Sequence, residues 1–203
     1  EDGSMAGVVT QAGQSHRGVG VILATGHSAR DIFNLCVDQD IKIESKPFAL
    51  GVRVEHPQEQ IDQIQYHSNE RGFLPAASYS LVHQSKLAGK ERGVFSFCMC
   101  PGGFIVPAAT SSDEIVVNGM SPSRRDSKYA NSGIVVAIED QDLKDFDSLG
   151  PLVGMEFQAS VEKRAWRSVS KGQVAPAQRL EDFIRGTHSP SLYASSYQPG
   201  LES

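Results

Sequence analysis

The chain has 203 residues, of which 39% are hydrophobic and 21% charged, a composition typical of a folded globular protein. Its net charge of −5 argues against nucleic-acid binding, because neutralising phosphates needs a local surplus of Lys and Arg. No apolar run approaches the roughly 20 residues of a membrane-spanning helix, and no signal peptide is recognisable. The 3 cysteines do not form the even set of a secreted disulfide framework. We therefore expect a cytoplasmic protein that has no nucleic-acid or membrane partner.

The N-terminal part has the pattern of an α/β unit. Residues 5–26 predict a β-hairpin with its turn at residues 11–14. The almost wholly apolar Val19–Leu23 segment is typical of a strand buried on both faces. Ser28–Asp31 has the spacing of a capping box and predicts a helix that runs to about Val37. The turn between strand and helix would place backbone N–H groups where a phosphate or an oxygen-rich ligand could bind.

From Ile41 onward the pattern changes to short strands. Residues 46–56 alternate apolar and polar side chains, which predicts a strand with Arg53 and Glu55 on one face. A short helix is predicted around residues 58–65. Further strands, separated by Gly, Pro, Ser and Asn, are predicted at Ser78–Val82, Val94–Cys100, Phe104–Val106, Ile115–Asn118 and Gly133–Ile138. Strands at this spacing indicate an antiparallel sheet or a small β-barrel.

The C-terminal third is predicted to be helical, which makes the expected fold class α+β. Apolar residues recur every four positions from Val153 to Val169, and this stripe predicts a helix that begins near Pro151. Trp166 lies beside the stripe and is interpreted as a core residue. A second helix is predicted over residues 176–185, with Gly186 as its stop. Its inward-facing residues are expected to be Ala177, Leu180, Phe183 and Ile184.

The segment FSFCMCPGG, residues 95–103, carries two of the three cysteines. Regular alternation along a strand would place Cys98 and Cys100 on the same face, with Cα atoms about 7 Å apart, near or beyond the reach of a disulfide. Two thiolates are half of a tetrahedral metal site, and no second pair is visible, so no metal is predicted. Two interpretations stay open: small apolar residues of a buried strand, or thiols that face a ligand beside a glycine turn.

Three arginines are candidates for binding an anion. Arg53 projects from the predicted strand beside Gly51, whereas Arg124 and Arg125 follow an Asn-Gly turn in a Ser-rich segment. A guanidinium can hold a carboxylate or phosphate by two parallel hydrogen bonds. The second pair is equally typical of a solvated loop.

Several ordered segments resemble a family of bacterial FAD-dependent dehydrogenases, largely uncharacterised flavoproteins with a β-barrel and helix insertion in the FAD-binding domain. They include ILATGHSARDIF, KPFALGVRVEHPQEQID, LPAASYSLV, FSFCMCPGGFIVPAAT and VVNGMSPSRRDSKYANSGIVV. The resemblance extends from about Val19 to Gly200. It implies an intact enzyme in which hydride passes between a substrate and FAD, with NAD(P) as a candidate electron partner.

The resemblance also implies a domain organisation. Residues 1–45 would be a remnant of the FAD-binding domain, and residues 46–200 an inserted substrate or cap domain, so that the chain is the middle of a larger flavoprotein. The glycine-rich dinucleotide fingerprint of the family is missing from these residues. We therefore expect the chain alone neither to hold FAD tightly nor to be active. Its expected partners are the rest of the FAD-binding domain and a small-molecule substrate.

The same resemblance suggests roles for individual residues. The cofactor contacts would be Thr25, Gly26 and His27 near the predicted strand end, and Pro101, Gly102 and Gly103 in the turn after the cysteines. The candidate catalytic residues are Cys98 and Cys100, and the candidate substrate-binding residues are Arg53, Arg124 and Arg125. His27 could instead be hydrogen-bonded in the first turn of its helix. The alternative function is a non-catalytic module that binds a ligand, metal or partner through the Cys-Met-Cys turn and the basic loop.

Overall fold

The computed structural model describes residues 3–87, 89–169 and 172–203. The chain divides into two compact units, Glu1–Ile43 and Glu44–Ser203. In the first unit, strands β1 (Gly7–Val9) and β2 (Ser15–Arg17) pair antiparallel, and helix α1 spans Arg30–Asp38. The predicted helix, the first strand of the hairpin and its turn are therefore confirmed. The second strand is wrong, because β1 pairs with Ser15–Arg17 and not with the residues from Val19 onward.

Two details of the N-terminal unit differ from the prediction. The apolar Val19–Leu23 segment lies in no strand, and Ile22 is 93% exposed, because no neighbouring strand of the described chain pairs with it. A sheet strand needs a partner for its backbone groups, which composition alone does not supply. The helix also begins without a capping box: Ala29 is the N-cap and makes no side-chain bond, while Ser28 Oγ lies 3.0 Å from His27 Nδ1.

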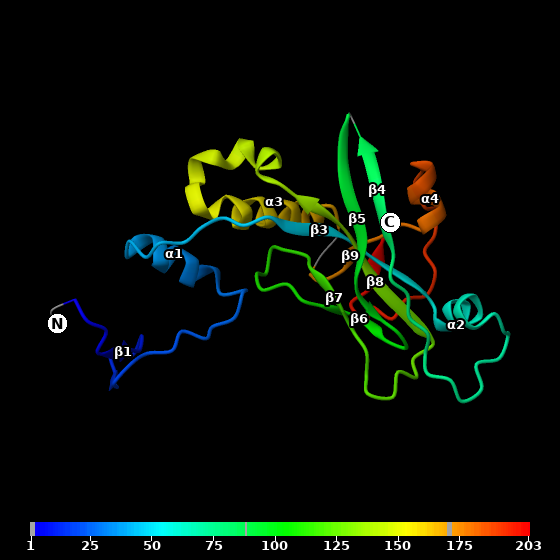
Figure 1. The fold of residues 1–203 in the computed structure, drawn as a ribbon, viewed down its shortest axis with the longest axis horizontal. Coiled ribbons are helices and arrows are strands. Elements are labelled where there is room, and N and C mark those ends of the chain that lie inside the picture. Colours follow the sequence, from blue (N-terminus) through cyan, green and yellow to red (C-terminus); the bar gives the residue numbers. More distant parts are fainter. Residues whose placement is uncertain (1–2, 88, 170–171) are drawn as a thin grey trace. The chain divides into compact units, whose positions relative to one another are not determined.

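The second unit is built on a four-stranded antiparallel sheet with the order β3-β8-β5-β4 (Figure 1). Its strands are β3 (Phe48–Pro57), β8 (Tyr129–Ile138), β5 (Lys90–Cys100) and β4 (Val82–Leu87). The sheet is open, with β3 and β4 at its edges, so the antiparallel-sheet alternative is confirmed rather than the barrel. The strand predicted at Ser78–Val82 is wrong, because the pairing with β5 starts only at Val82.

Two small sheets complete the strand structure of this unit. Strands β6 (Phe104–Pro107) and β7 (Val117–Met120) form an antiparallel pair. Strands β9 (Ala175–Pro176) and β10 (Leu201–Glu202) pair in parallel and fasten the C-terminal tail. The α+β class predicted from the sequence is confirmed.

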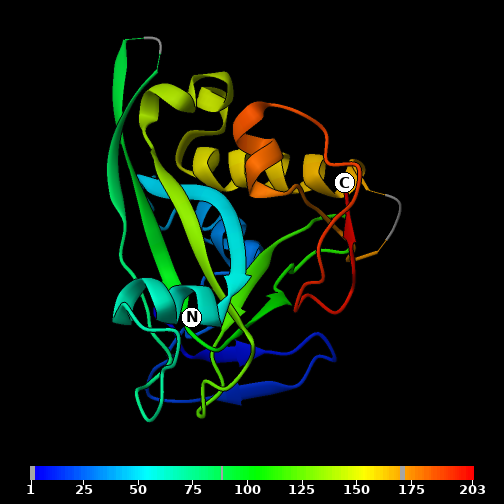
Figure 2. The same ribbon diagram turned by 90° about the vertical axis from the view of Figure 1, so that its right-hand side faces the viewer.

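Helices cover the two ends of the main sheet. Helix α2 (Gln58–Tyr66) follows β3 directly, and the 3-10 segments η1 (Asp140–Asp142) and η2 (Lys144–Leu152) lead from β8 into α3 (Val153–Arg167). Figures 1 and 2 show α2 at one end of the sheet and η2 with α3 at the other. Among the described residues, no helix is both long enough and apolar enough to cross a membrane.

Three apolar clusters form the core of the second unit. One joins α2 to β8 around Ile61, Ala77 and Ala130, and a second joins η1, α3 and β8 around Ile138, Leu143 and Val153. The third surrounds Ile115, Ala175 and Tyr197, and Trp166 packs against it. The predicted core position of Trp166 is therefore confirmed.

The last helix, α4 (Leu180–Arg185), ends at Gly186, which has a left-handed φ of 66° as the stop signal predicts. Its predicted inward face is wrong. Leu180, Phe183 and Ile184 are 54%, 59% and 76% exposed, whereas Asp182 is buried. Asp182 accepts hydrogen bonds from Arg179 Nε at 2.7 Å and from a serine hydroxyl, and this polar anchor sets the orientation of a helix only 6 residues long.

Candidate functional site

Strand β5 contains a β-bulge at Cys98 and Met99. These two residues stand opposite the single residue Ser132 of β8, between the regular pairs at Phe97 and Cys100. Cys98 has a left-handed φ of 45°, a conformation that costs a residue with a Cβ about 1–2 kcal/mol. The FSFCMCPGG segment is therefore a bent strand rather than a regular one.

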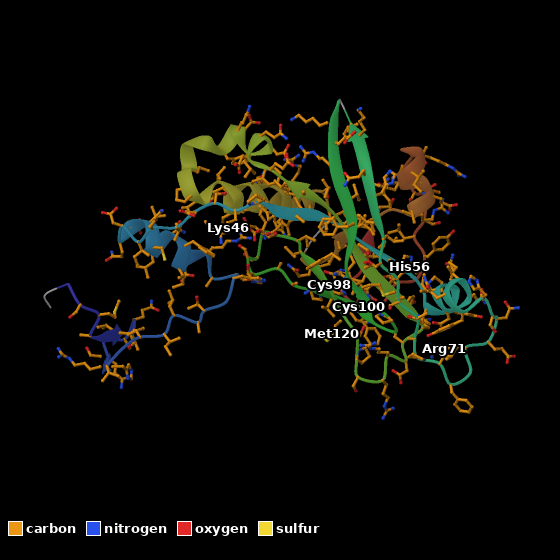
Figure 3. The ribbon with its side chains drawn as sticks, in the orientation of Figure 1. Lys46, His56, Arg71, Cys98, Cys100 and Met120 are labelled. Carbon is orange, nitrogen blue, oxygen red and sulfur yellow. The ribbon has the colours of Figure 1, made fainter. Side chains whose placement is uncertain are left out.

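The bulge changes the direction of both thiols. A regular strand was predicted to place Cys98 and Cys100 on one face, and that prediction is wrong because the inserted residue breaks the alternation. Cys100 is buried on the side of the sheet that carries Arg53, and its Sγ–H donates to the Cys98 carbonyl at 3.3 Å. Cys98 is exposed, whereas Met99 packs against the apolar cluster of Ile61, Ala77 and Ala130. Figure 3 shows both cysteines where β5 approaches β6 and β7.

Arg53 lies beside this bulge and is held by oxygen atoms from three different elements. Its Nη1 donates to Asn131 Oδ1 at 2.7 Å and to the Cys98 carbonyl at 3.3 Å. Its Nη2 donates to Asn118 Oδ1 at 3.4 Å. The guanidinium thus joins β3, β5, β7 and β8 at one point.

Glu55 occupies the next position on the same face of β3 but has a different partner. Its carboxylate accepts hydrogen bonds from the backbone N–H of Ser196 at 3.1 Å and from the Ser196 hydroxyl. The same hydroxyl accepts the backbone N–H of Ile105 at 2.8 Å. Glu55 therefore fixes the C-terminal tail against β6, and no ion pair joins it to Arg53 in the described chain.

The Arg53 guanidinium, its three oxygen acceptors and the Cys100 thiol form one group, which we call the Arg53 cluster. Gly119 is the residue whose backbone comes closest to it. A Cβ at this position would lie closer than 3.0 Å to Arg53 Nη1, Asn131 Oδ1 and Cys100 Sγ. A side chain here would displace at least one of these groups, so glycine lets β7 pack directly onto the Arg53 cluster. The Asn118-Gly119 pair, predicted as a turn, is instead part of β7.

The Pro101–Gly103 turn that follows the bulge is buried and internally bonded. The Gly102 N–H donates to Gln58 Oε1 at 2.6 Å, and the Gly103 N–H donates to the Tyr129 carbonyl at 2.9 Å. A cofactor contact through these two N–H groups would require both hydrogen bonds to break. The cofactor role of the turn stays a prediction.

Gln58 ties the turn to helix α2 through a buried polar network. Its amide nitrogen donates to Asp62 Oδ1 at 2.8 Å and to the Ala77 carbonyl at 3.0 Å, while its oxygen accepts the Gly102 N–H. Asp62 also accepts the backbone N–H of Ala77 at 2.8 Å and pairs with Arg71 at 3.0 Å. This network holds the base of the bulge in place.

A family model described as "FAD-dependent protein, C-terminal domain-like" matches residues 47–203. The chain belongs to this FAD-dependent family. An uncharacterised protein of Clostridium beijerinckii is 40% identical over 205 residues, an alignment that covers 100% of this chain and 37% of that protein. The chain therefore spans little more than a third of the length of this relative.

The other arginines suggested for substrate binding in the FAD-dependent family lie on an exposed loop. Arg124 and Arg125 are both exposed, and Arg125 has a left-handed φ of 51°. The backbone of Arg125 packs so tightly against Gly102 that no Cβ would fit there. Among the described residues, no hydrogen bond joins either guanidinium to the Arg53 cluster, so the substrate role of this loop also stays a prediction.

The flavin contacts suggested at Thr25, Gly26 and His27 belong to the N-terminal unit. All three residues are exposed, and Gly26 has a left-handed φ of 79°. His27 is hydrogen-bonded to Ser28 just before the helix starts, the alternative noted for it from the sequence. A cofactor role for these residues stays a prediction.

His56, on the opposite face of β3, forms a pair with Tyr79 that was not predicted from the sequence. His56 Nε2 and the Tyr79 hydroxyl are 2.6 Å apart. Burial lowers the pKa of His56, opposed by the charge of Glu55. Burial raises the pKa of Tyr79, opposed by a hydrogen bond with Ser132 and by the charge of Arg53. The two residues are 23 positions apart, and no spacing signal in the sequence connects them.

Two further features bear on what the unit can bind. In the described ranges, no three His, Cys, Asp or Glu side chains are placed to hold a metal ion. A hollow of about 410 Å³ lies along α3, away from the Arg53 cluster. It is lined by Phe146, Glu156, Ala159, Ser160, Lys163, Arg164 and Arg167.

Proposed function

We propose that this chain contributes the substrate-binding part of an FAD-dependent oxidoreductase, a dehydrogenase in which bound FAD supplies the two-electron acceptor. The observation that carries the proposal is the match of the FAD-dependent family over residues 47–203, which includes the whole Arg53 and Cys98 cluster. Residues 1–45 would belong to the FAD-binding domain and residues 46–200 to the substrate or cap domain, a boundary close to the division between the two compact units at Ile43 and Glu44. The exposed apolar Val19–Leu23 segment supports the first assignment, because a strand of that composition pairs and becomes buried only within a larger sheet.

The residues of the Arg53 cluster suit the ring or substrate end of a flavin site rather than its pyrophosphate end. Asn131 Nδ2 is buried and has no hydrogen-bond partner, and Gly119 allows the backbone to approach closely. By contrast, the glycine turn of Pro101–Gly103 has no N–H left to cradle phosphates. The chain's own contribution would be to bind and orient the substrate against the cofactor.

The two cysteines would have different roles. Cys98 is exposed at the bulge, so as a thiolate it could reach a bound ligand and would accept the proton that the substrate gives up on oxidation, or act as a nucleophile. Cys100 is buried and donates to the Cys98 carbonyl, so it positions the bulge. The catalytic assignment is therefore narrowed to Cys98.

The test is made on the intact flavoprotein and on the isolated chain. We expect the intact protein to show stoichiometric flavin absorbance and the isolated chain to show none. In the intact protein, Cys98→Ser is expected to slow flavin reduction by substrate by about tenfold or more, with unchanged flavin content. Cys100→Ser serves as the matched variant and is expected to have a smaller effect on the rate. Flavin-free intact protein would contradict the proposal, and unchanged kinetics in Cys98→Ser would remove the thiol from it.

A further inference from the structure

The Arg53 guanidinium has more hydrogen-bond donors than acceptors around it. A guanidinium carries five N–H donors. Two on Nη1 are taken by Asn131 and the Cys98 carbonyl, and one on Nη2 is taken by Asn118. One N–H on Nη2 and the N–H on Nε have no partner in the part of the chain that the structure describes. Nε has no acceptor and Nη2 has only the long bond to Asn118 at 3.4 Å, so an oxyanion can bind with two oxygens on the edge of the planar group that these nitrogens share.

The charge of Arg53 is also uncompensated. All three acceptors are neutral oxygens, and Glu55, the carboxylate nearest along the strand, is bonded to Ser196. No Asp or Glu of the described residues lies within ion-pair distance of Arg53. Arg53 is partly buried, and a cation that has lost part of its water without gaining a counter-ion is stabilised by a bound anion.

The cluster fixes the guanidinium before any ligand arrives. Asn131, which accepts the shortest of the three bonds, is fully buried, and Gly119 packs against both groups. A side chain held in one position loses little freedom on binding, which is what a specific site requires.

The surroundings favour an apolar body for the ligand. Phe97 and Arg53 flank Gly133 on one face of the sheet, because both are its register partners. Gly133 has no side chain to separate them: a Cβ added there would lie 3.2 Å from the Phe97 carbonyl oxygen, 3.7 Å from Phe97 Cβ and 3.8 Å from Arg53 Nη2. Phe97 itself is 56% exposed, although it lies on the same sheet as the core residues. A ligand on the free edge of Arg53 would therefore contact an aromatic ring.

We propose that Arg53 binds the carboxylate of an organic acid whose apolar part contacts Phe97, and, resting on the proposed function, that this acid is the substrate class of the oxidoreductase. A carboxylate is favoured over a phosphate because a single cation balances a single negative charge. The planar fork of the guanidinium matches the two carboxylate oxygens.

The experiment uses the 203-residue chain with 15N-labelled arginine, titrated with benzoate, acetate and inorganic phosphate at constant ionic strength. We expect one arginine Nε–H signal to shift saturably, to bind benzoate more tightly than acetate, and to be the signal missing from Arg53→Lys. The Kd for benzoate should rise by about tenfold or more in Arg53→Lys and by less than about twofold in Arg185→Lys, an exposed arginine of α4.

A glycine pair controls for loss of folding. Gly119→Ala should weaken benzoate binding because the new methyl displaces the guanidinium. Gly93→Ala should leave it unchanged, because the nearest atom to its Cβ is 3.8 Å away. A non-saturable shift, or equal Kd values in Arg53→Lys and Arg185→Lys, would refute the site, and tighter binding of phosphate than of either carboxylate would refute the ligand class. These outcomes are read without flavin, so they are independent of whether the intact protein binds FAD.

Discussion

Replacing Gln58 with methionine removes the contact that connects helix α2 to the base of the Cys98 bulge. Gln58 is 3% exposed and makes three side-chain hydrogen bonds, to Asp62, Ala77 and Gly102. The bonds to the two neutral backbone groups contribute about 1 kcal/mol each, and the bond to the Asp62 carboxylate about 1.5–3 kcal/mol. Methionine has a similar volume, so little of the effect would come from a cavity. We expect the free energy of unfolding to fall by roughly 3–5 kcal/mol in Gln58→Met.

That loss is a large part of the roughly 5–15 kcal/mol by which a domain is stable. The measurement is urea unfolding of the chain, followed by circular dichroism, with the same denaturant slope in both proteins. Gln63→Met is the matched control on the same helix. Gln63 bonds only to Glu59, at 3.4 Å on an exposed surface, and its loss should change stability by less than about 0.5 kcal/mol.

The same variant has a local consequence. Without Gln58, the buried Gly102 N–H loses its acceptor, so we expect faster hydrogen exchange at Gly102 than the global loss of stability explains. A loss of stability below about 1 kcal/mol, or equal effects at Gln58 and Gln63, would show that the network does not carry the strength assigned to it.

Three other predictions concern charge and backbone packing. The Arg92 guanidinium, aided by a backbone N–H, holds the pKa of Asp142 at about 2, so this stabilisation is present above pH 3.8 and is lost as the pH falls toward 2. Asp142→Asn should lower stability by roughly 1–2 kcal/mol at neutral pH and flatten the acid-unfolding curve, and an unchanged curve would contradict the pairing. Burial lowers the pKa of His56, so protonation favours the unfolded chain and stability falls as the pH drops below 6.5. Urea unfolding at a series of pH values should show a weaker pH dependence of stability in His56→Gln. An equal pH dependence in both proteins would argue against this role of His56. Gly51→Ala should lower the free energy of unfolding by more than about 2 kcal/mol, measured by thermal or urea unfolding, because its Cβ would overlap the backbone of β8. Gly93→Ala, which has space around its Cβ, should leave stability almost unchanged. Similar losses in both variants would contradict this packing.

The sequence was most informative where one face of an element is buried and the element is regular. The alternation in residues 46–56 predicted β3 and placed Arg53 and Glu55 on the same face of it. The apolar residues that recur every four positions from Val153 predicted α3. In both elements the period of the side chains is set by local geometry, so the pattern and the structure agree.

Departures from regular geometry were not predictable in this way. The bulge at Cys98 depends on the register between β5 and β8, strands that are separated in sequence by about 30 residues. Helix α4 was assigned the wrong inner face because its orientation comes from the buried Asp182 and its partners, not from its apolar residues. Val19–Leu23 has the composition of a buried strand, but composition does not supply the neighbour that such a strand pairs with.

The candidate site shows the same division. Arg53 could be selected from the sequence, because it is a charged residue on a predicted strand and lies beside Gly51. Asn118, Gly119 and Asn131 could not. Asn131 reaches Arg53 through the pairing of β8 with β3, and Asn118 and Gly119 reach it through the packing of β7 onto this sheet. The charged group was therefore predictable from the sequence, whereas the neutral residues that hold it were not.

The measurement that tests the central claim most directly is a structure of the intact, FAD-loaded protein with a carboxylic acid bound. We expect the acid to lie between the flavin ring and the Arg53 cluster, with its carboxylate on the free edge of Arg53 and the Cys98 side chain in contact with the ligand or the ring. A flavin ring that contacts neither Cys98 nor Arg53, with this face turned to solvent, would contradict it.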